Sequence, residues 1–165
     1  MKTLKRSITV LVCLILFISC TKSIDYNKEE SNIEVREEIT YYKGTPFTGE
    51  IFENYENGQL KYKNNFKDGK QVENETYYEN GQLWVKNNFK DGTIVGLAEQ
   101  YYKNGQLQYK SNYKDGKKDG LSEEYYENGQ LEYKANYKDG ISLSTEHYNE
   151  NGQLTYKTKD GKIIN

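Results

Sequence analysis

The chain of 165 residues has few of the side chains on which enzymes and metal sites depend. It contains one histidine, two cysteines, one proline and one tryptophan. A zinc site needs several histidine or cysteine ligands, and a catalytic triad needs a nucleophile, a base and an orienting group. We therefore expect no enzyme, no catalytic residue, no metal site and no cofactor.

Aliphatic residues are also scarce. Beyond Cys20, leucine, isoleucine, valine and phenylalanine together make up 24 of 145 residues, which is too few for a conventional two-layer α/β core. Tyrosine is abundant in contrast, with 17 copies. Aromatic residues favour strands, and no sustained helical period is present, so the composition indicates a β protein.

The first nineteen residues have the features of a targeting signal. Lys2, Lys5 and Arg6 precede an apolar run of 11 residues, Ile8 to Ile18. A membrane-spanning helix needs roughly 20 apolar residues, so this run is too short to remain in a membrane. Its length is typical of the apolar region of a secretory signal peptide, which we expect over residues 1–19.

Cys20 follows directly after this signal. The sequence Phe17-Ile18-Ser19-Cys20 resembles a bacterial lipobox, and the resemblance implies cleavage before Cys20 and a diacylglycerol on its sulfur. An ordinary cleaved signal with an incidental cysteine is the alternative. We expect a lipoprotein of the bacterial cell envelope, anchored in the inner or the outer membrane. Loss of the signal changes the net charge from −2 to −5, which argues against a nucleic-acid partner.

Residues 20–38 are highly charged and show no clear period. We expect the lipidated cysteine and a polar tether here, with a short helix over 28–38 as the alternative. As a flexible coil, the tether would hold a domain roughly 20–25 Å from a membrane surface. The remaining residues, 39–165, form the predicted folded part.

The tetrapeptide Asn-Gly-Gln-Leu recurs five times in this part at spacings of 23 or 24 residues, and Asp-Gly follows each copy; such a period is the signature of a repeat architecture. Asn-Gly and Asp-Gly both supply the positive φ angles of a two-residue type I′ hairpin turn. We therefore predict an all-β, elongated antiparallel meander, a single-layer sheet of about five repeats with two strands each. The Asn-Gly turns are Asn57 and Gly58, Asn80 and Gly81, Asn104 and Gly105, Asn128 and Gly129, and Asn151 and Gly152; the Asp-Gly turns begin at Asp68, Asp91, Asp115, Asp139 and Asp160.

A two-residue Asn-Gly turn also predicts the strand register and the two faces of the sheet. It places Tyr126 opposite Leu131 and pairs a glutamate with a lysine in three repeats. These pairs are Glu75 with Lys86, Glu99 with Lys110, and Glu123 with Lys134. One face then carries an apolar stripe: Leu60, Tyr62, Phe66, Leu83, Val85, Phe89, Leu107, Tyr109, Tyr113, Leu131, Tyr133 and Tyr137. The other face carries Tyr77, Trp84, Tyr101 and Tyr125 among charged residues.

The repeat unit from Tyr125 to Gly140 resembles the MORN repeat variant, in the bacterial form grouped as YwqK-type antitoxin proteins. The resemblance covers roughly residues 41–162. It implies an elongated hairpin array used for interaction. Two repeats depart from the pattern: the second has Val72 in place of a glycine, and the fifth has Ser142 there and an extra residue before its turn.

We expect an envelope-anchored, non-catalytic array that binds a protein partner, such as a toxin or a surface protein, in the manner of an antitoxin or immunity protein. The candidate binding face is Tyr62, Val85, Tyr109, Tyr113, Tyr133 and Tyr137, because a single-layer sheet leaves these apolar side chains uncovered. A cell-wall or glycan-binding module built from aromatic hairpins is the alternative.

Two further features, the single histidine and the repeated aspartates, are weak indications of a catalytic or a calcium site. His147, the single histidine, is predicted to take the place of Tyr125 in the repeat, as a substituted sheet position. The repeated aspartates suggest calcium, but each lies beside a lysine, and a calcium loop gathers several oxygens within one short segment.

Overall fold

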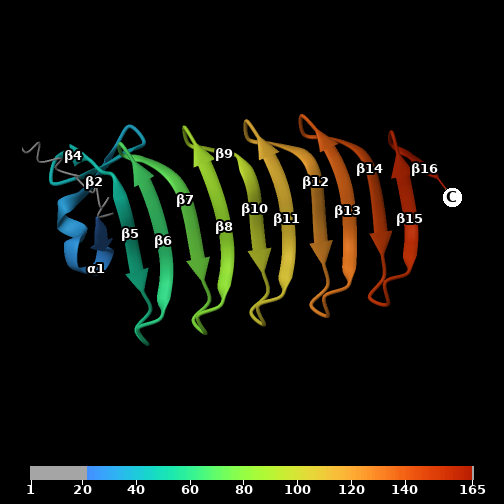
Figure 1. Ribbon diagram of the computed structural model, residues 1–165, viewed down its shortest axis with the longest axis horizontal. Coiled ribbons are helices and arrows are strands. Elements are labelled where there is room, and N and C mark those ends of the chain that lie inside the picture. Colours follow the sequence, from blue (N-terminus) through green and yellow to red (C-terminus); the bar gives the residue numbers. More distant parts are fainter. Residues whose placement is uncertain (1–21, 165) are drawn as a thin grey trace, which may run out of the picture.

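The computed structural model of the protein describes residues 22–164, so the predicted signal peptide and Cys20 lie outside the described residues. Within this range the chain forms one long sheet of consecutive hairpins, with a small cap at its first edge (Figure 1). No helix in residues 22–164 is long and apolar enough to cross a membrane. The predicted all-β architecture is confirmed.

The main sheet is antiparallel except at its first edge, and its strands follow the order of the chain. Its edge strand is β1 (Ser23–Asp25). The other strands are β5 (Gly49–Asn54), β6 (Leu60–Lys67), β7 (Lys70–Tyr77), β8 (Leu83–Lys90), β9 (Thr93–Ile94), β10 (Gly96–Tyr101), β11 (Leu107–Lys114), β12 (Lys117–Tyr125), β13 (Leu131–Lys138), β14 (Ile141–Tyr148), β15 (Leu154–Lys159) and β16 (Lys162–Ile164).

The Asp-Gly motif forms the predicted two-residue turn. In the β6–β7 hairpin, Asp68 and Gly69 have φ angles of +50° and +79°, and Lys67 pairs with Lys70. The other four Asp-Gly turns also have positive φ at both residues. This is the type I′ geometry, whose twist matches that of the flanking strands.

The Asn-Gly motif forms a different turn from the one predicted. In the fourth repeat only Gly129 has a positive φ, +84°. Its N–H donates to the Tyr126 carbonyl at 2.9 Å, and the Tyr126 N–H donates to the Gln130 carbonyl at 2.9 Å. The loop therefore has three residues, a type I turn closed by a glycine bulge. Asn128 instead accepts the Gln130 N–H on its side chain at 2.9 Å, as in an Asx turn.

The bulge changes the predicted register close to the turn and leaves it unchanged farther away. The three predicted Glu–Lys pairs are all present. Leu131, however, lies opposite Tyr125 rather than Tyr126. Side chains alternate along a strand, so the four leucines of the predicted apolar stripe join the face of Tyr125 and leave that stripe. We call the face with Tyr109, Ser111 and Tyr113 face A, and the face with Lys110 and Glu123 face B.

The Asn-Gly turns also bind one repeat to the next. The Tyr102 hydroxyl donates to the Tyr125 carbonyl at 2.7 Å, and the Asn80 side-chain amide donates to the Lys103 carbonyl at 2.8 Å. Equivalent bonds recur along this edge from Tyr55, Tyr78 and Tyr126 and from Asn57, Asn104 and Asn128. Stability in such an array comes from contacts between neighbouring repeats, and these two side chains supply part of it.

The first edge of the sheet is covered by residues 22–48. The prediction of a polar tether is wrong for residues 22–38, which form strands and one short helical segment. The elements of residues 22–48 are β1 (Ser23–Asp25), α1 (Tyr26–Glu29), the 3₁₀ turn η1 (Glu30–Asn32), β2 (Ile33–Arg36), β3 (Ile39–Tyr42) and β4 (Thr45–Pro46). Strand β1 pairs in parallel with β5, and Ile24, Tyr42, Phe47 and Ile51 form a buried cluster. An uncovered strand edge invites unwanted pairing, and the cap removes that liability.

The fifth repeat is in a different register from the one predicted. His147 pairs with Tyr133, the position that Glu124 holds one repeat earlier, so it does not replace Tyr125. Tyr148 takes that place, since its carbonyl accepts the Tyr126 hydroxyl. The repeat therefore has no extra residue before its turn. The difference arises because its chain is one residue shorter after the Asp-Gly turn.

Candidate functional site

Face A has a central row of small residues flanked by tyrosines. Ala98, Ser111, Ser122 and Ala135 pair in succession across four strands and are all buried, with Ser122 at 0% exposure. Tyr109 and Tyr113 flank Ser111 along the strand, and their hydroxyls form a hydrogen bond of 3.0 Å with each other. Tyr133 and Tyr137 flank Ala135 in the same way, with a hydrogen bond of 2.9 Å. Tyrosine pairs thus cover the small residues, which leaves the rings themselves half-buried rather than free.

The structure brings the six predicted binding residues to this one face. Tyr62, Val85, Tyr109 and Tyr133 occupy equivalent positions on β6, β8, β11 and β13, while Tyr113 and Tyr137 lie four residues after two of them. All six are half-buried. Equivalent positions in successive repeats are two strands apart, or roughly 10 Å. The face therefore presents these side chains, aromatic at every position except Val85, at a regular spacing along the sheet.

Face A carries polar and charged groups as well as aromatic rings. Burial raises the pKa of the Tyr133 hydroxyl, and its hydrogen bond with Tyr137 adds to the effect, so this group remains a neutral donor. The Lys118 ammonium lies 5.1 Å from the Tyr109 ring centre and 5.0 Å from that of Tyr137. These are cation–π distances, so the rings of face A accept a positive charge.

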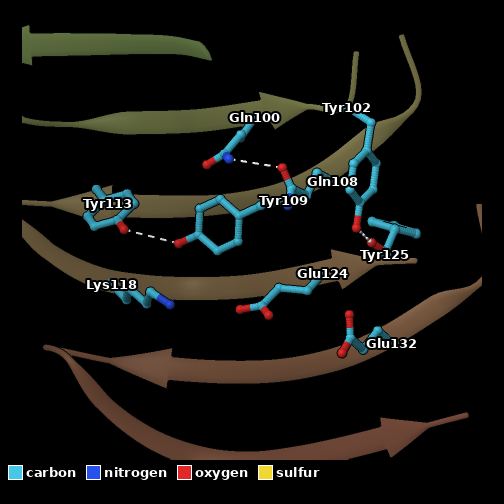
Figure 2. A pocket seen from close by; sticks show the side chains of 9 residues that line it. All are labelled: Gln100, Tyr102, Gln108, Tyr109, Tyr113, Lys118, Glu124, Tyr125 and Glu132. Carbon is cyan, nitrogen blue, oxygen red and sulfur yellow. Dashed lines mark hydrogen bonds between the residues drawn. The ribbon is translucent and has the colours of Figure 1, made fainter. Parts of the chain in front are cut away.

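A pocket of about 400 Å³ opens on face A across β10 to β13 (Figure 2). Gln100, Tyr109 and Glu124 lie side by side on three strands, with Lys118 on one side of this row and Glu132 on the other. Gln108, Tyr102, Tyr113 and Tyr125 complete the lining. Rings, amides and carboxylates are combined here without any aliphatic side chain. Such a site can hold a ligand through ring contacts and several hydrogen bonds.

Sequence reasoning misplaced two residues of this pocket because of the bulge. Gln108 and Glu132 are the bulged residues of their hairpins, and a two-residue turn places them on face B. Trp84 holds the same position one repeat earlier, so it leaves its predicted face too. A signal was present in the sequence: these positions differ from repeat to repeat, whereas the turn residues recur.

Face B carries a ladder of alternating charge along the whole sheet. Successive strands place lysine and glutamate opposite one another: Lys63, Glu75, Lys86, Glu99, Lys110, Glu123, Lys134, Glu146 and Lys157. Short ion pairs join several neighbours, including Lys63 to Glu75 and Lys110 to Glu123, both at 2.6 Å. Cross-strand pairs of opposite charge stabilise a sheet, so this ladder has a structural role.

Glu75 is the most strongly held carboxylate of this ladder. Lys63, Lys86 and Tyr77 all hydrogen-bond to it. Burial alone raises the pKa of this carboxyl, but the three hydrogen bonds outweigh burial and lower the pKa from 4.5 to about 2. A depressed pKa in the folded state stabilises the fold above pH 4.5, and this contribution is lost as the pH falls toward 2.

Glu75→Gln is expected to lower the free energy of unfolding at pH 7 by about 1–3 kcal/mol, because a charged acceptor is lost. The stability of this variant should also change less than that of the wild type between pH 4.5 and 2. Urea unfolding across this pH range measures both effects. Glu79→Gln, an exposed turn residue, is the control and should keep the wild-type profile. A parallel pH profile for wild type and Glu75→Gln would contradict the assignment.

The turn aspartates do not gather into a cation site. No group of three or more histidine, cysteine, aspartate or glutamate side chains within residues 22–164 is arranged to hold a metal ion. Asp91 instead pairs with Lys70 at 2.5 Å. His147 lies between two rings, 4.7 Å from Tyr133 and 4.2 Å from Tyr156, and its contacts are those of a packed sheet residue.

Comparisons with known proteins agree with the repeat architecture. No curated protein matches the chain. Among solved structures, it is similar to a mutant of S. aureus TarM in complex with fondaparinux, alpha-GlcNAc-glycerol and UDP, at 12% identity and a TM-score of 0.24. That match covers 84% of this chain and only 22% of TarM, and so low a TM-score supports no inference. The MORN repeat variant pattern matches residues 47–68, 70–91, 94–115 and 118–139, more than half of the sequence. The chain therefore belongs to the MORN repeat variant family.

Proposed function

We propose that this protein is a non-catalytic interaction module which binds a protein partner through face A. The observation that carries the proposal is the pocket at the centre of a regular row of half-buried tyrosines. Tyrosine is enriched at the energetic centres of protein interfaces because its ring gives contact area and its hydroxyl a hydrogen bond. Face B, in contrast, pairs most of its charges internally.

The envelope location is part of the same proposal. A lipid on Cys20 would anchor the chain in a bacterial membrane, while the folded part begins only two residues later, at Lys22. The cap would then lie close to the membrane, and the sheet would extend away from it. This arrangement suits an immunity-type protein of the YwqK antitoxin kind, whose partner is a toxin reaching the cell surface.

Two adjacent residues allow a direct test, because Gln100 lies on face A and Glu99 on face B. A photo-reactive amino acid at position 100 of the full chain, in intact cells, is expected to capture a protein. The same group at position 99 is the control and should capture none. Capture only at 99 would overturn the assignment of the face. Capture of glycan instead of protein at 100 would favour the cell-wall reading.

A further inference from the structure

Two positions of every hairpin change from repeat to repeat although the turn residues between them recur. One is the last face A residue before the turn, and the other is the bulged residue after it. The five pairs are Glu53 and Lys61, Thr76 and Trp84, Gln100 and Gln108, Glu124 and Glu132, and His147 and Thr155. These pairs follow one another along face A, one pair for each hairpin. Because their residues differ, each repeat presents a different chemical group on this face.

Most of these pairs are internally complementary. Lys61 forms an ion pair with Glu53 at 2.7 Å, and the Gln100 amide donates to Gln108 at 2.9 Å. In the fifth hairpin the Thr155 hydroxyl donates to the carbonyl of its pair member, His147. Each of these contacts is made within one hairpin.

The fourth hairpin is the one whose pair carries two like charges. Glu124 and Glu132 carry the same charge, and neither side chain has an ion-pair or hydrogen-bond partner in the described part of the chain. Like charges placed together across strands destabilise a sheet. In the first hairpin Glu53, which is equivalent to Glu124, forms an ion pair with Lys61. In the fourth hairpin a cation from outside the chain would compensate the two negative charges in the same way.

The pocket around this pair is shaped for one such cation. Its charged groups are two carboxylates and the Lys118 ammonium, which leaves a net charge of −1. Lys118 lies at the end of the pocket away from Glu132 (Figure 2). The rings of Tyr109 and Tyr102 lie beside the two carboxylates, Tyr109 nearer Glu124 and Tyr102 nearer Glu132 (Figure 2). Lys118 already shows that the Tyr109 ring attracts a positive group.

We propose that Glu124 and Glu132 receive the side chain of one arginine of the protein partner. The inference rests on the proposed function and names the chemistry that the face recognises. A guanidinium is planar, so it can stack on a tyrosine ring while its five N–H groups reach two carboxylates and the Gln100 carbonyl. Lysine offers only a compact charge and no stacking plane. A saccharide would satisfy the hydroxyl and amide groups but would leave the two carboxylates uncompensated.

The test uses the ¹⁵N-labelled full chain in non-ionic detergent, titrated with N-acetyl-arginine amide and followed by NMR. The expected result is saturable shifts at Tyr109 and Glu124, with a dissociation constant of about 1–10 mM for so small a ligand. Glu124→Gln combined with Glu132→Gln should weaken binding at least about tenfold. The matched control, Glu127→Gln combined with Glu150→Gln, removes two exposed turn charges and should leave binding unchanged.

Two neutral ligands test whether the pocket recognises the positive charge of arginine. N-acetyl-citrulline amide has the shape of the arginine probe without its charge and should give no saturable shift. Equal binding of citrulline, equal weakening in the control variant, or shifts with diacetylchitobiose but not with arginine would each overturn the inference. If the arginine probe fails while position 100 still captures a protein, the inference is wrong and the proposed function stands. If position 100 captures no protein, the proposed function fails whatever the titration shows.

Discussion

Ile51→Ala is expected to lower the free energy of unfolding by about 2–5 kcal/mol, the usual cost of truncating a large buried aliphatic side chain. Ile51 is 4% exposed and lies in the cluster that joins the cap to strand β5, with Ile24 and Phe47. A sheet of half-buried rings has no comparable core elsewhere in residues 22–164. The loss should therefore release the cap as well as weaken the first hairpin.

Ile163→Ala is the matched control for this prediction. Ile163 lies in β16, at the opposite end of the main sheet, and is 74% exposed. The same substitution there should change stability by no more than about 0.5 kcal/mol. Urea unfolding of the full chain, followed by circular dichroism, measures both variants. Equal effects at the two positions would mean that residues 22–48 do not cap the array.

The hairpin order could be predicted from the sequence because local rules decide it. Asp-Gly can adopt positive φ at both residues, and a two-residue turn then determines which side chains face each other, as Lys67 and Lys70 do. The three Glu–Lys pairs independently indicated which residues of neighbouring strands lie opposite each other away from the turns. These features depend only on residues close together in the chain.

The Asn-Gly turn was mispredicted because the same dipeptide also fits a longer loop. Asn128 bonds its own turn with its side-chain oxygen and the next repeat with its amide, and both bonds are available in the three-residue form. The second bond is between repeats and cannot be inferred from a single hairpin. The resulting bulge moved Leu131 to face B and Glu132 to face A, and with them part of the candidate site.

The cap was missed for a related reason. Ile24 and Ile33 are isolated apolar residues within a charged segment, a pattern that also fits a tether. Their burial depends on contacts with Tyr42, Phe47 and Ile51, which lie up to 27 residues away. Composition carries no information on such contacts. The tyrosines were placed on the correct face, but the small residues beneath them, such as Ser122, were not recognised as the reason for their spacing.

The second large expected effect is a loss of partner binding, and two double tyrosine variants, one on each face, test it. Tyr109→Ser combined with Tyr133→Ser removes rings from face A, and Tyr77→Ser combined with Tyr101→Ser removes rings from face B, outside the pocket. All four rings are half-buried, so both variants lose packing and both should melt at a lower temperature. Only the face A variant should also lose binding.

Capture of the partner by cross-linking on intact cells, corrected for the folded fraction of each variant, tests this claim most directly. Hot-spot tyrosines typically contribute more than about 1 kcal/mol each, so the face A variant should capture at least about tenfold less partner than the wild type. The face B variant should capture as much as the wild type. Equal capture by the two variants, or a greater loss from face B, would contradict the account.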